Sequence, residues 1–281
     1  MLRPWKFRYT GHLGLRGPDA PMFAKSAAST DPADQIDFLA DLGFAGVQDI
    51  YLKLRPRRTQ ERMASRMARR GLAMGTFNMA PAQWRTGVWT SDDAAARTLL
   101  RDELATAVAA ADRAGGGAAV CVGLHDESRP REVQRAIMAE HLKRLAEPAQ
   151  KAGLMLLVEP VAAAYLPGFL IDRQADAVAL VRAVDSPMVR LLFDTGHVQT
   201  SEGEVLENLK ACWDMVGGLQ AADTPGRRDV GAGEIDWPPI LRWLQDQGYM
   251  GLIELEHEAQ DSGADGEQRL VERLRAVEAT I

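Results

Sequence analysis

Two segments near the C-terminus, LQAADTPGRRDVGAGEIDW (219–237) and GLIELEHE (251–258), decide the fold of this chain. Each begins as a short apolar segment that reads as a strand and ends at a polar side chain, which is Gln220 in the first and Glu256 in the second. A Gly/Pro-rich loop follows the first segment, and its composition is typical of an irregular connection. Polar groups therefore stand where two strands end.

Two earlier segments repeat this arrangement. LMLLVEP (154–160) places Glu159 at the end of an apolar run, and VRLLFDTGHVQ (189–199) does the same with Asp194. An α/β barrel assembles its active site at the C-terminal ends of its parallel strands. The four strand ends predict such a site, with one residue from each: Glu159, Asp194, Gln220 and Glu256.

The whole chain alternates between short apolar runs and amphipathic segments, as repeated βα units do. Its 281 residues suit one α/β barrel, since these domains commonly have roughly 250 residues. We therefore expect an α/β fold, a single-domain (β/α)8 TIM barrel over 1–281. The eight expected strands centre on 6–9, 46–49, 73–77, 118–123, 154–159, 189–194, 218–222 and 251–256.

Start and stop residues mark several helices between these strands. Asp31 before Pro32 is a helix start, and Gly43 is the matching end. The other expected helix starts are Ser91, Pro130 (with Pro148 near the end of its helix), Asp236 and, for the last helix, about Gly266. The longest irregular stretches are 11–30, 79–91 and 224–237. Each follows an expected strand, so all three should lie over the barrel mouth.

Composition excludes several classes of protein. The formal charge of −6 provides no basic field, which disfavours a nucleic-acid partner. Cys121 and Cys212 are too few for a disulfide framework or a cysteine zinc site, which favours a reducing cytoplasm. The N-terminus has no apolar stretch of signal-peptide length, and no segment approaches the length of a membrane span, so we expect a cytoplasmic protein that does not contact a membrane.

The four polar strand ends have the chemistry of a metal site. Carboxylate and amide oxygens are hard ligands, which favour Mg²⁺ or Mn²⁺ over a metal that prefers thiolates. Their separations of 26 to 36 residues are about one βα unit each, so they would stand at the same height in a barrel. Any one of these residues, considered alone, could equally be a solvated or salt-bridged side chain at the end of a strand.

Several motifs resemble those of the xylose isomerase-like barrels, and among them most closely the hydroxypyruvate isomerase group. They are FNMAPAQW (77–84), VEP (158–160), FDTGHVQ (193–199), QAADTPGRRDVGAGEIDW (220–237) and LIELE (252–256). The resemblance extends over most of the chain, and the 220–237 block is its most specific part. In that family the metal ligands come from strands five to eight, which implies Glu159, Asp194, Gln220 and Glu256 here.

The resemblance implies a divalent-metal-dependent isomerase or epimerase of a keto-sugar or hydroxy-keto acid, acting through an enediolate. Moving a carbonyl between adjacent carbons requires a base beside an electrophile, and Glu159 and Glu256 would take and return the proton. Four residues would contact the substrate: His197, Arg227 (or its neighbour Arg228), His125 and Trp84. The resemblance also implies a homo-oligomer, either a dimer or a tetramer.

The sequence departs from the resemblance at positions that would touch or support substrate. VAAAYLPGF (161–169) follows VEP where the group usually has Asn and other polar residues, and Gln48 stands where Glu is common. Three alternatives stay open. The same site in a lyase or dehydratase would eliminate a leaving group from a 3-keto sugar or glycoside. A DNA-repair endonuclease would need a histidine-rich zinc site and a basic face, whereas a non-catalytic barrel would only bind a sugar.

Overall fold

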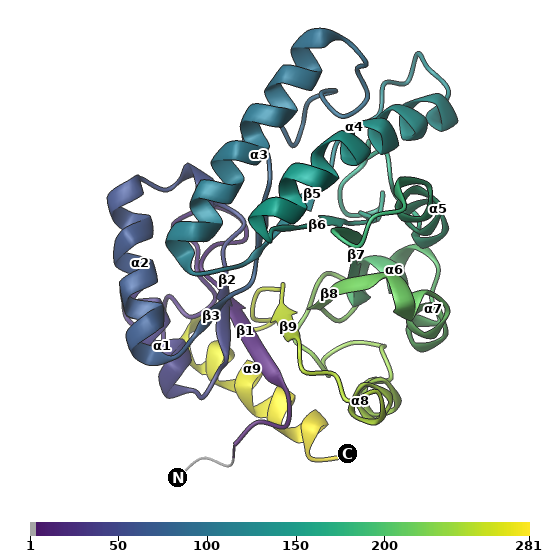
Figure 1. The fold of residues 1–281 in the computed structure, drawn as a ribbon. Coiled ribbons are helices and arrows are strands. Elements are labelled where there is room, and N and C mark those ends of the chain that lie inside the picture. The colour runs from purple at the N-terminus through teal and green to yellow at the C-terminus, as the bar shows by residue number, and fades with distance from the viewer. Residues whose placement is uncertain (1–3) are drawn as a thin grey trace.

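The structure is a computed structural model that describes residues 4–281. Its strands pair in parallel into one sheet, with helices arranged around the outside (Figure 1). The strands are β1 (Arg8–His12), β2 (Gly46–Gln48), β3 (Ala73–Met74), β4 (Thr76–Asn78), β5 (Ala118–Cys121), β6 (Met155–Val158), β7 (Val189–Asp194), β8 (Val216–Ala221) and β9 (Leu252–Leu255). Their order in the sheet is β3-β2-β1-β9-β8-β7-β6-β5-β4.

The sheet closes on itself at Gly75. This residue alone separates β3, which pairs with β2, from β4, which pairs with β5. The Gly75 N–H donates to the Val47 carbonyl (2.8 Å), and the Gly75 carbonyl accepts from the Ala118 N–H (3.3 Å). β3 and β4 are therefore one interrupted strand, and the predicted (β/α)8 TIM barrel is confirmed.

Helices alternate with the strands and cover the barrel (Figure 1). They are α1 (Pro32–Asp41), α2 (Arg57–Arg70), α3 (Ala94–Ala114), α4 (Arg131–Ala152), α5 (Gln174–Val184), α6 (Thr195–Ser201), α7 (Val205–Cys212), α8 (Trp237–Asp246) and α9 (Gly263–Glu278), with short 3₁₀ turns η1 (Leu52–Leu54) and η2 (Trp213–Met215). Glu278 at the end of α9 accepts hydrogen bonds from the N–H groups of Lys6 and Phe7 (2.8 and 3.1 Å), so the last helix is fastened to the start of the barrel. Within residues 4–281, no helix combines the length and the apolar character that a membrane span needs.

The hydrophobic core has two parts. The larger part fills the space between strands and helices, while a small cluster of Val120, Leu157 and Leu192 lies inside the barrel. The interior also holds a polar contact, because Glu254 on β9 reaches across to Thr76 on β4. A barrel interior is normally filled by apolar side chains, so this buried carboxyl group is exceptional.

Several element boundaries differ from those predicted. The first strand spans Arg8–His12 rather than 6–9, because Thr10 to His12 pair with β2. Asp93, not Ser91, caps α3: its side chain accepts from the Ala96 N–H (2.7 Å). The last helix begins at Gly263, slightly before the predicted start.

We predict that Gly75→Ala destabilises the barrel. A Cβ there would lie 2.1 Å from Glu254 Oε1 and 3.1 Å from the Val47 carbonyl oxygen. Glu254 cannot easily move, because it accepts from the Thr76 N–H (2.6 Å) and the Thr76 hydroxyl (2.5 Å). Overpacking of this kind should lower the free energy of unfolding by about 1–3 kcal/mol, measured by urea unfolding.

The matched control is Gly17→Ala. A Cβ at Gly17 meets no heavy atom within 4 Å, so this variant should unfold at the urea concentration of the unmodified protein. Equal midpoints for the two alanine variants would contradict the closure argument.

Candidate active site

The four polar strand ends predicted as metal ligands lie together at the barrel mouth. Glu159 directly follows β6, Asp194 ends β7, Gln220 lies on β8, and Glu256 directly follows β9. Asp194, Gln220 and Glu256 are buried, and only 11% of the Glu159 side chain is exposed. Adjacent parallel strands bring their C-terminal ends to one edge of the barrel, which accounts for this convergence.

His197 joins this group from the first turn of α6. The Asp194 side chain caps that helix by accepting from the His197 N–H (2.8 Å). The His197 Nδ1 accepts from the Ala162 N–H (3.2 Å), while its Nε2 lies 3.2 Å from Arg227 Nη1 and 3.5 Å from Glu159 Oε1. Backbone at Ala162 thus orients the histidine, although its side chain has no polar group.

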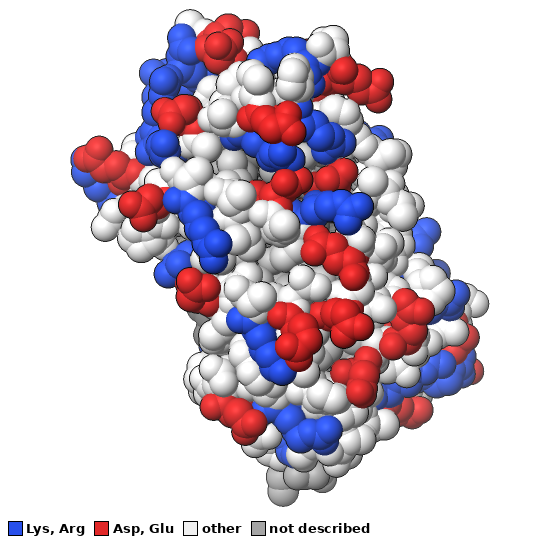
Figure 2. All heavy atoms as spheres, turned by 90° about the vertical axis from the view of Figure 1, so that its right-hand side faces the viewer, with Lys and Arg blue, Asp and Glu red and all other residues white. Residues whose placement is uncertain are grey.

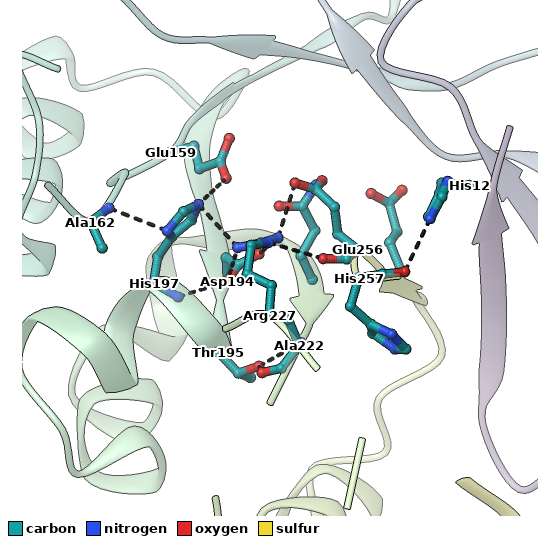
Figure 3. Close-up of polar contacts among 12 residues, drawn as sticks. His12, Glu159, Ala162, Asp194, Thr195, His197, Ala222, Arg227, Glu256 and His257 are labelled. Carbon is teal, nitrogen blue, oxygen red and sulfur yellow. Dashed lines mark hydrogen bonds and ion pairs between the residues drawn. The ribbon is translucent and has the colours of Figure 1, made fainter. Parts of the chain in front are cut away.

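Arg227 lies at the centre of the site, as Figure 3 shows. Its Nη2 donates to Asp194 Oδ2 (2.8 Å) and to Glu256 Oε1 (3.0 Å), and its Nη1 donates to Asp194 Oδ1 (3.2 Å). Its neighbour Arg228 donates to the Pro225 carbonyl (2.7 Å) and takes no part in these contacts. Of the two candidate arginines in this loop, Arg227 is therefore the one that points inward.

The acidic groups differ in protonation because their surroundings differ. Burial raises the pKa of Glu159 well above its usual range, and the charges of Glu256 and Asp194 raise it further. Burial also acts to raise the pKa of Asp194, but Arg227 and His197 together outweigh it, and the net shift of this pKa is downward. Burial lowers the pKa of His197 to about 4. At neutral pH, Asp194 is therefore ionised and His197 is neutral, while Glu159 is the group that most readily keeps a proton.

A layer of polar side chains beneath the mouth holds Glu256. Its Oε2 accepts from Gln48 Nε2 (2.5 Å) and from Gln220 Nε2. Thr76 lies 3.3 Å from Gln48 Nε2 and connects this layer to Glu254, where burial raises the pKa to about 7. Thr76 and Glu254 were missed by sequence reasoning, although Glu254 stands two residues before Glu256 and so faces the same side of its strand.

The predicted residues Trp84 and His125 lie in different surroundings. Trp84 lines the cavity beside Glu159 and His197, with its ring centroid 5.9 Å from that of Phe169. His125 does not line this cavity, and its Nδ1 contacts the Gly168 carbonyl (2.9 Å). His125 therefore connects two loops, and nothing places it against a substrate.

The donor set suits a divalent cation. Ligand atoms of Glu159, Asp194 and His197 lie within 4.8 Å of one another, so these three residues could hold a metal ion. Gln220 Oε1 is buried without a hydrogen-bond partner, which makes a further oxygen available. Hard oxygen donors with one imidazole fit Mg²⁺ or Mn²⁺. Arg227 is bonded to both Asp194 oxygens and would have to withdraw from them.

The closed parallel barrel and its acidic mouth define the class of α/β-barrel proteins that carry a polar site at the C-terminal ends of their strands. The sequence model of the xylose isomerase-like TIM barrel family matches residues 36–279, and the chain belongs to this family.

Two curated relatives are isomerases. The chain is 29% identical over 197 residues to a 2-oxo-tetronate isomerase of Cupriavidus necator, which covers 69% of this chain and 76% of that protein. It is also 29% identical over 168 residues to the hydroxypyruvate isomerase of Escherichia coli, which covers 59% of this chain and 65% of that protein.

Solved structures share the fold. A family 2 AP endonuclease of Brucella melitensis has a TM-score of 0.78 at 21% identity, and the match covers 92% of this chain and 96% of that one. A D-allulose 3-epimerase of Methylomonas sp. has a TM-score of 0.76 at 18% identity and is matched over the full length of both chains. At these identities the likeness concerns the barrel alone.

We predict that Arg227→Met binds Mn²⁺ more tightly than the unmodified protein. The guanidinium occupies the Asp194 oxygens and repels a cation, and both effects disappear with the charge. Hydrogen bonds to charged groups contribute about 1.5–3 kcal/mol, so the dissociation constant should fall at least about tenfold, measured by calorimetric titration.

Arg228→Met provides the control, because it removes the same charge from the adjacent position outside the site. Its affinity for Mn²⁺ should match that of the unmodified protein. Weaker binding by Arg227→Met than by this control would show that Arg227 does not compete with the cation.

Proposed function

We propose that the protein is a divalent-metal-dependent isomerase or epimerase that moves a proton on a carbon next to a carbonyl group. The observation that carries this proposal is the placement of Glu159 and Glu256 in one cavity, on either side of Asp194 and Gln220. The two curated isomerase relatives support the reaction class. The proposed substrates are keto-sugars or hydroxy-keto acids.

Two carboxyl groups in one cavity suit a reaction that removes and returns a proton. Of Glu159 and Glu256, the ionised one takes the proton from the carbon beside the carbonyl group, and the protonated one returns a proton to the neighbouring carbon or the opposite face. Gln48 and Gln220 fix Glu256 Oε2 by donating to it, so the carboxyl group is held before substrate arrives. A divalent cation held by Glu159, Asp194, Gln220 and Glu256 would polarise the carbonyl and acidify the adjacent C–H bond.

The neighbouring donors suit the oxygens of the same substrate. His197 is neutral and turns its Nε2 toward Glu159 and Arg227, so this nitrogen, when protonated, would donate to a substrate oxygen without adding a buried charge. Arg227, released from Asp194 by a cation, would donate to a substrate hydroxyl or carbonyl from the loop after β8. A small carbohydrate or keto acid is therefore the proposed partner.

The main alternative is a lyase or dehydratase that uses the same acidic pair to eliminate a leaving group. A nuclease is favoured less. The group of possible metal ligands found among the described residues contains a single histidine. Acidic and basic side chains are also interspersed on the face shown in Figure 2, without a continuous basic band for a nucleic acid.

We predict that Glu159→Gln and Glu256→Gln each strongly slow the exchange of a substrate C–H for deuterium. Metal-loaded protein is incubated in D₂O with hydroxypyruvate, ketoses, sugar acids and 3-keto glycosides, and products are followed by proton NMR. General acid–base catalysis contributes typically 10²- to 10⁴-fold, so each variant should lose roughly that factor in rate.

Glu258→Gln is the control, since Glu258 faces Arg16 and does not line the cavity. It should retain the full rate. Products of unchanged mass identify an isomerase or epimerase, whereas loss of water or of an aglycone identifies the lyase. Exchange that survives in Glu159→Gln and Glu256→Gln would contradict the assigned roles.

A further inference from the structure

The cavity has one polar half and one apolar half. Four polar lining residues come from the ends of β6 to β9, where the proposed chemistry takes place, and two more are Asn78, which ends β4, and Tyr51, which follows β2. Nine of the fifteen lining residues are apolar, and most of these belong to the strands and loops around β4, β5 and β6. The part of a substrate that extends away from the reacting carbons would therefore meet a hydrocarbon surface. The main apolar contributors are Pro81, Trp84, Val122, Val161, Leu166 and Phe169.

The apolar half is built into the fold rather than being a loose loop. Leu124 and Phe169 form an antiparallel bridge between the loops after β5 and β6. Arg131 on α4 donates to the Phe169 carbonyl (3.0 Å), and Phe169 itself is 3% exposed. Arg85 stacks 4.9 Å above the Trp84 ring, so a cation–π contact supports the indole. The rings of Trp84 and Phe169 thus form one side of the cavity. We call this side, together with Leu166, the apolar wall.

The apolar half of the cavity has no cation for an acidic group. Among the described residues, neither lysine nor arginine lines this half, and Arg227 lies at the polar end, bonded to Asp194 and Glu256. Lys53 and Arg55 lie just beyond the lining residue Tyr51, and both are engaged: Lys53 is bonded to Glu103, and Arg55 donates to Asp49 (2.5 Å).

The apolar half offers a substrate carboxylate no partner. Its lining side chains are hydrocarbon or aromatic, apart from the polar groups of Asn78 and Tyr51. A carboxylate held there would be buried without a cation, and burying an unpaired charge is strongly unfavourable. An uncharged group avoids this cost.

We propose that the substrate is an uncharged hydroxy ketone with an apolar group on the carbons away from the reaction, and that Trp84, Leu166 and Phe169 select this group. This inference rests on the proposed isomerase or epimerase function. It separates this chain from its relatives named for 2-oxo-tetronate and hydroxypyruvate, which are both acids. A deoxy sugar, with methyl in place of hydroxymethyl, is the simplest compound with these properties.

The test compares ketohexoses that differ only at carbon 6, as methyl, hydroxymethyl or carboxylate, across the available stereoisomers. Deuterium exchange with Mn²⁺-loaded protein gives kcat/KM, and saturation-transfer NMR with the same samples ranks binding. We expect the order methyl, hydroxymethyl, carboxylate. A buried methyl group should give a preference of about fourfold, and the carboxylate should fall at least about tenfold below the methyl compound.

Two variants assign the preference to the apolar wall. Trp84→Ala should raise KM for the methyl compound toward that of the hydroxymethyl compound while leaving kcat unchanged, and Trp84→Phe should restore most of the preference. Leu166→Arg, on the partly exposed rim, introduces the missing cation and should improve the carboxylate compound at least about tenfold. Thermal unfolding of each variant checks that it folds.

The outcomes for the two proposals can be told apart. If no compound exchanges deuterium, the proposed reaction is wrong, and the binding order still decides the inference about the substrate. If the carboxylate compound binds or reacts as well as the methyl compound, the inference is overturned even when exchange occurs. A preference for the methyl compound that survives in Trp84→Ala would overturn the role of the wall.

Discussion

Burial of three carboxyl groups around one barrel mouth is the constraint on which the site depends. Glu159, Asp194 and Glu256 lose hydration there, and isolated buried carboxylates are costly. Arg227 compensates by donating to two of them. It also pushes the pKa of Asp194 below its usual value, against the effect of burial. The buried carboxylates are stabilised by a nearby positive charge, which Arg227 supplies. A metal cation would stabilise them in the same way, and this is the physical basis for expecting one.

The loop after β8 positions Arg227 in the site. The buried Asp223 organises it by accepting hydrogen bonds from Gly231 N–H (3.1 Å), Ile235 N–H (3.0 Å) and Trp237 Nε1 (2.9 Å). Arg227 itself has φ of +50°, a left-handed conformation that side-chain-bearing residues seldom adopt. Its ion pairs with the buried carboxylates offset that strain. The sequence of residues 220–237 is thus constrained in two ways. It must fold the loop around Asp223, and it must place the buried charge of Arg227.

Polar and apolar lining residues occupy different parts of the same cavity. The ends of β6 to β9 supply acids and donors, whereas the loops after β4, β5 and β6 supply the apolar wall. Strand ends are fixed by the barrel ladder, but loops can change composition without disturbing it. The segment after Glu159 illustrates this: Ala162 keeps a backbone contact with His197, while Val161 and Phe169 make the wall apolar. The same barrel can therefore retain a reaction and change its substrate.

The sequence by itself determined the barrel and the convergence of its four polar strand ends, because apolar runs that stop at polar residues are local patterns and parallel strands must end together. Only the tertiary structure decided which loop arginine turns inward, that Gln48 braces Glu256, and that Glu254 reaches across the barrel. These contacts join residues far apart in the chain, and their geometry follows from barrel closure and burial, which no local pattern records.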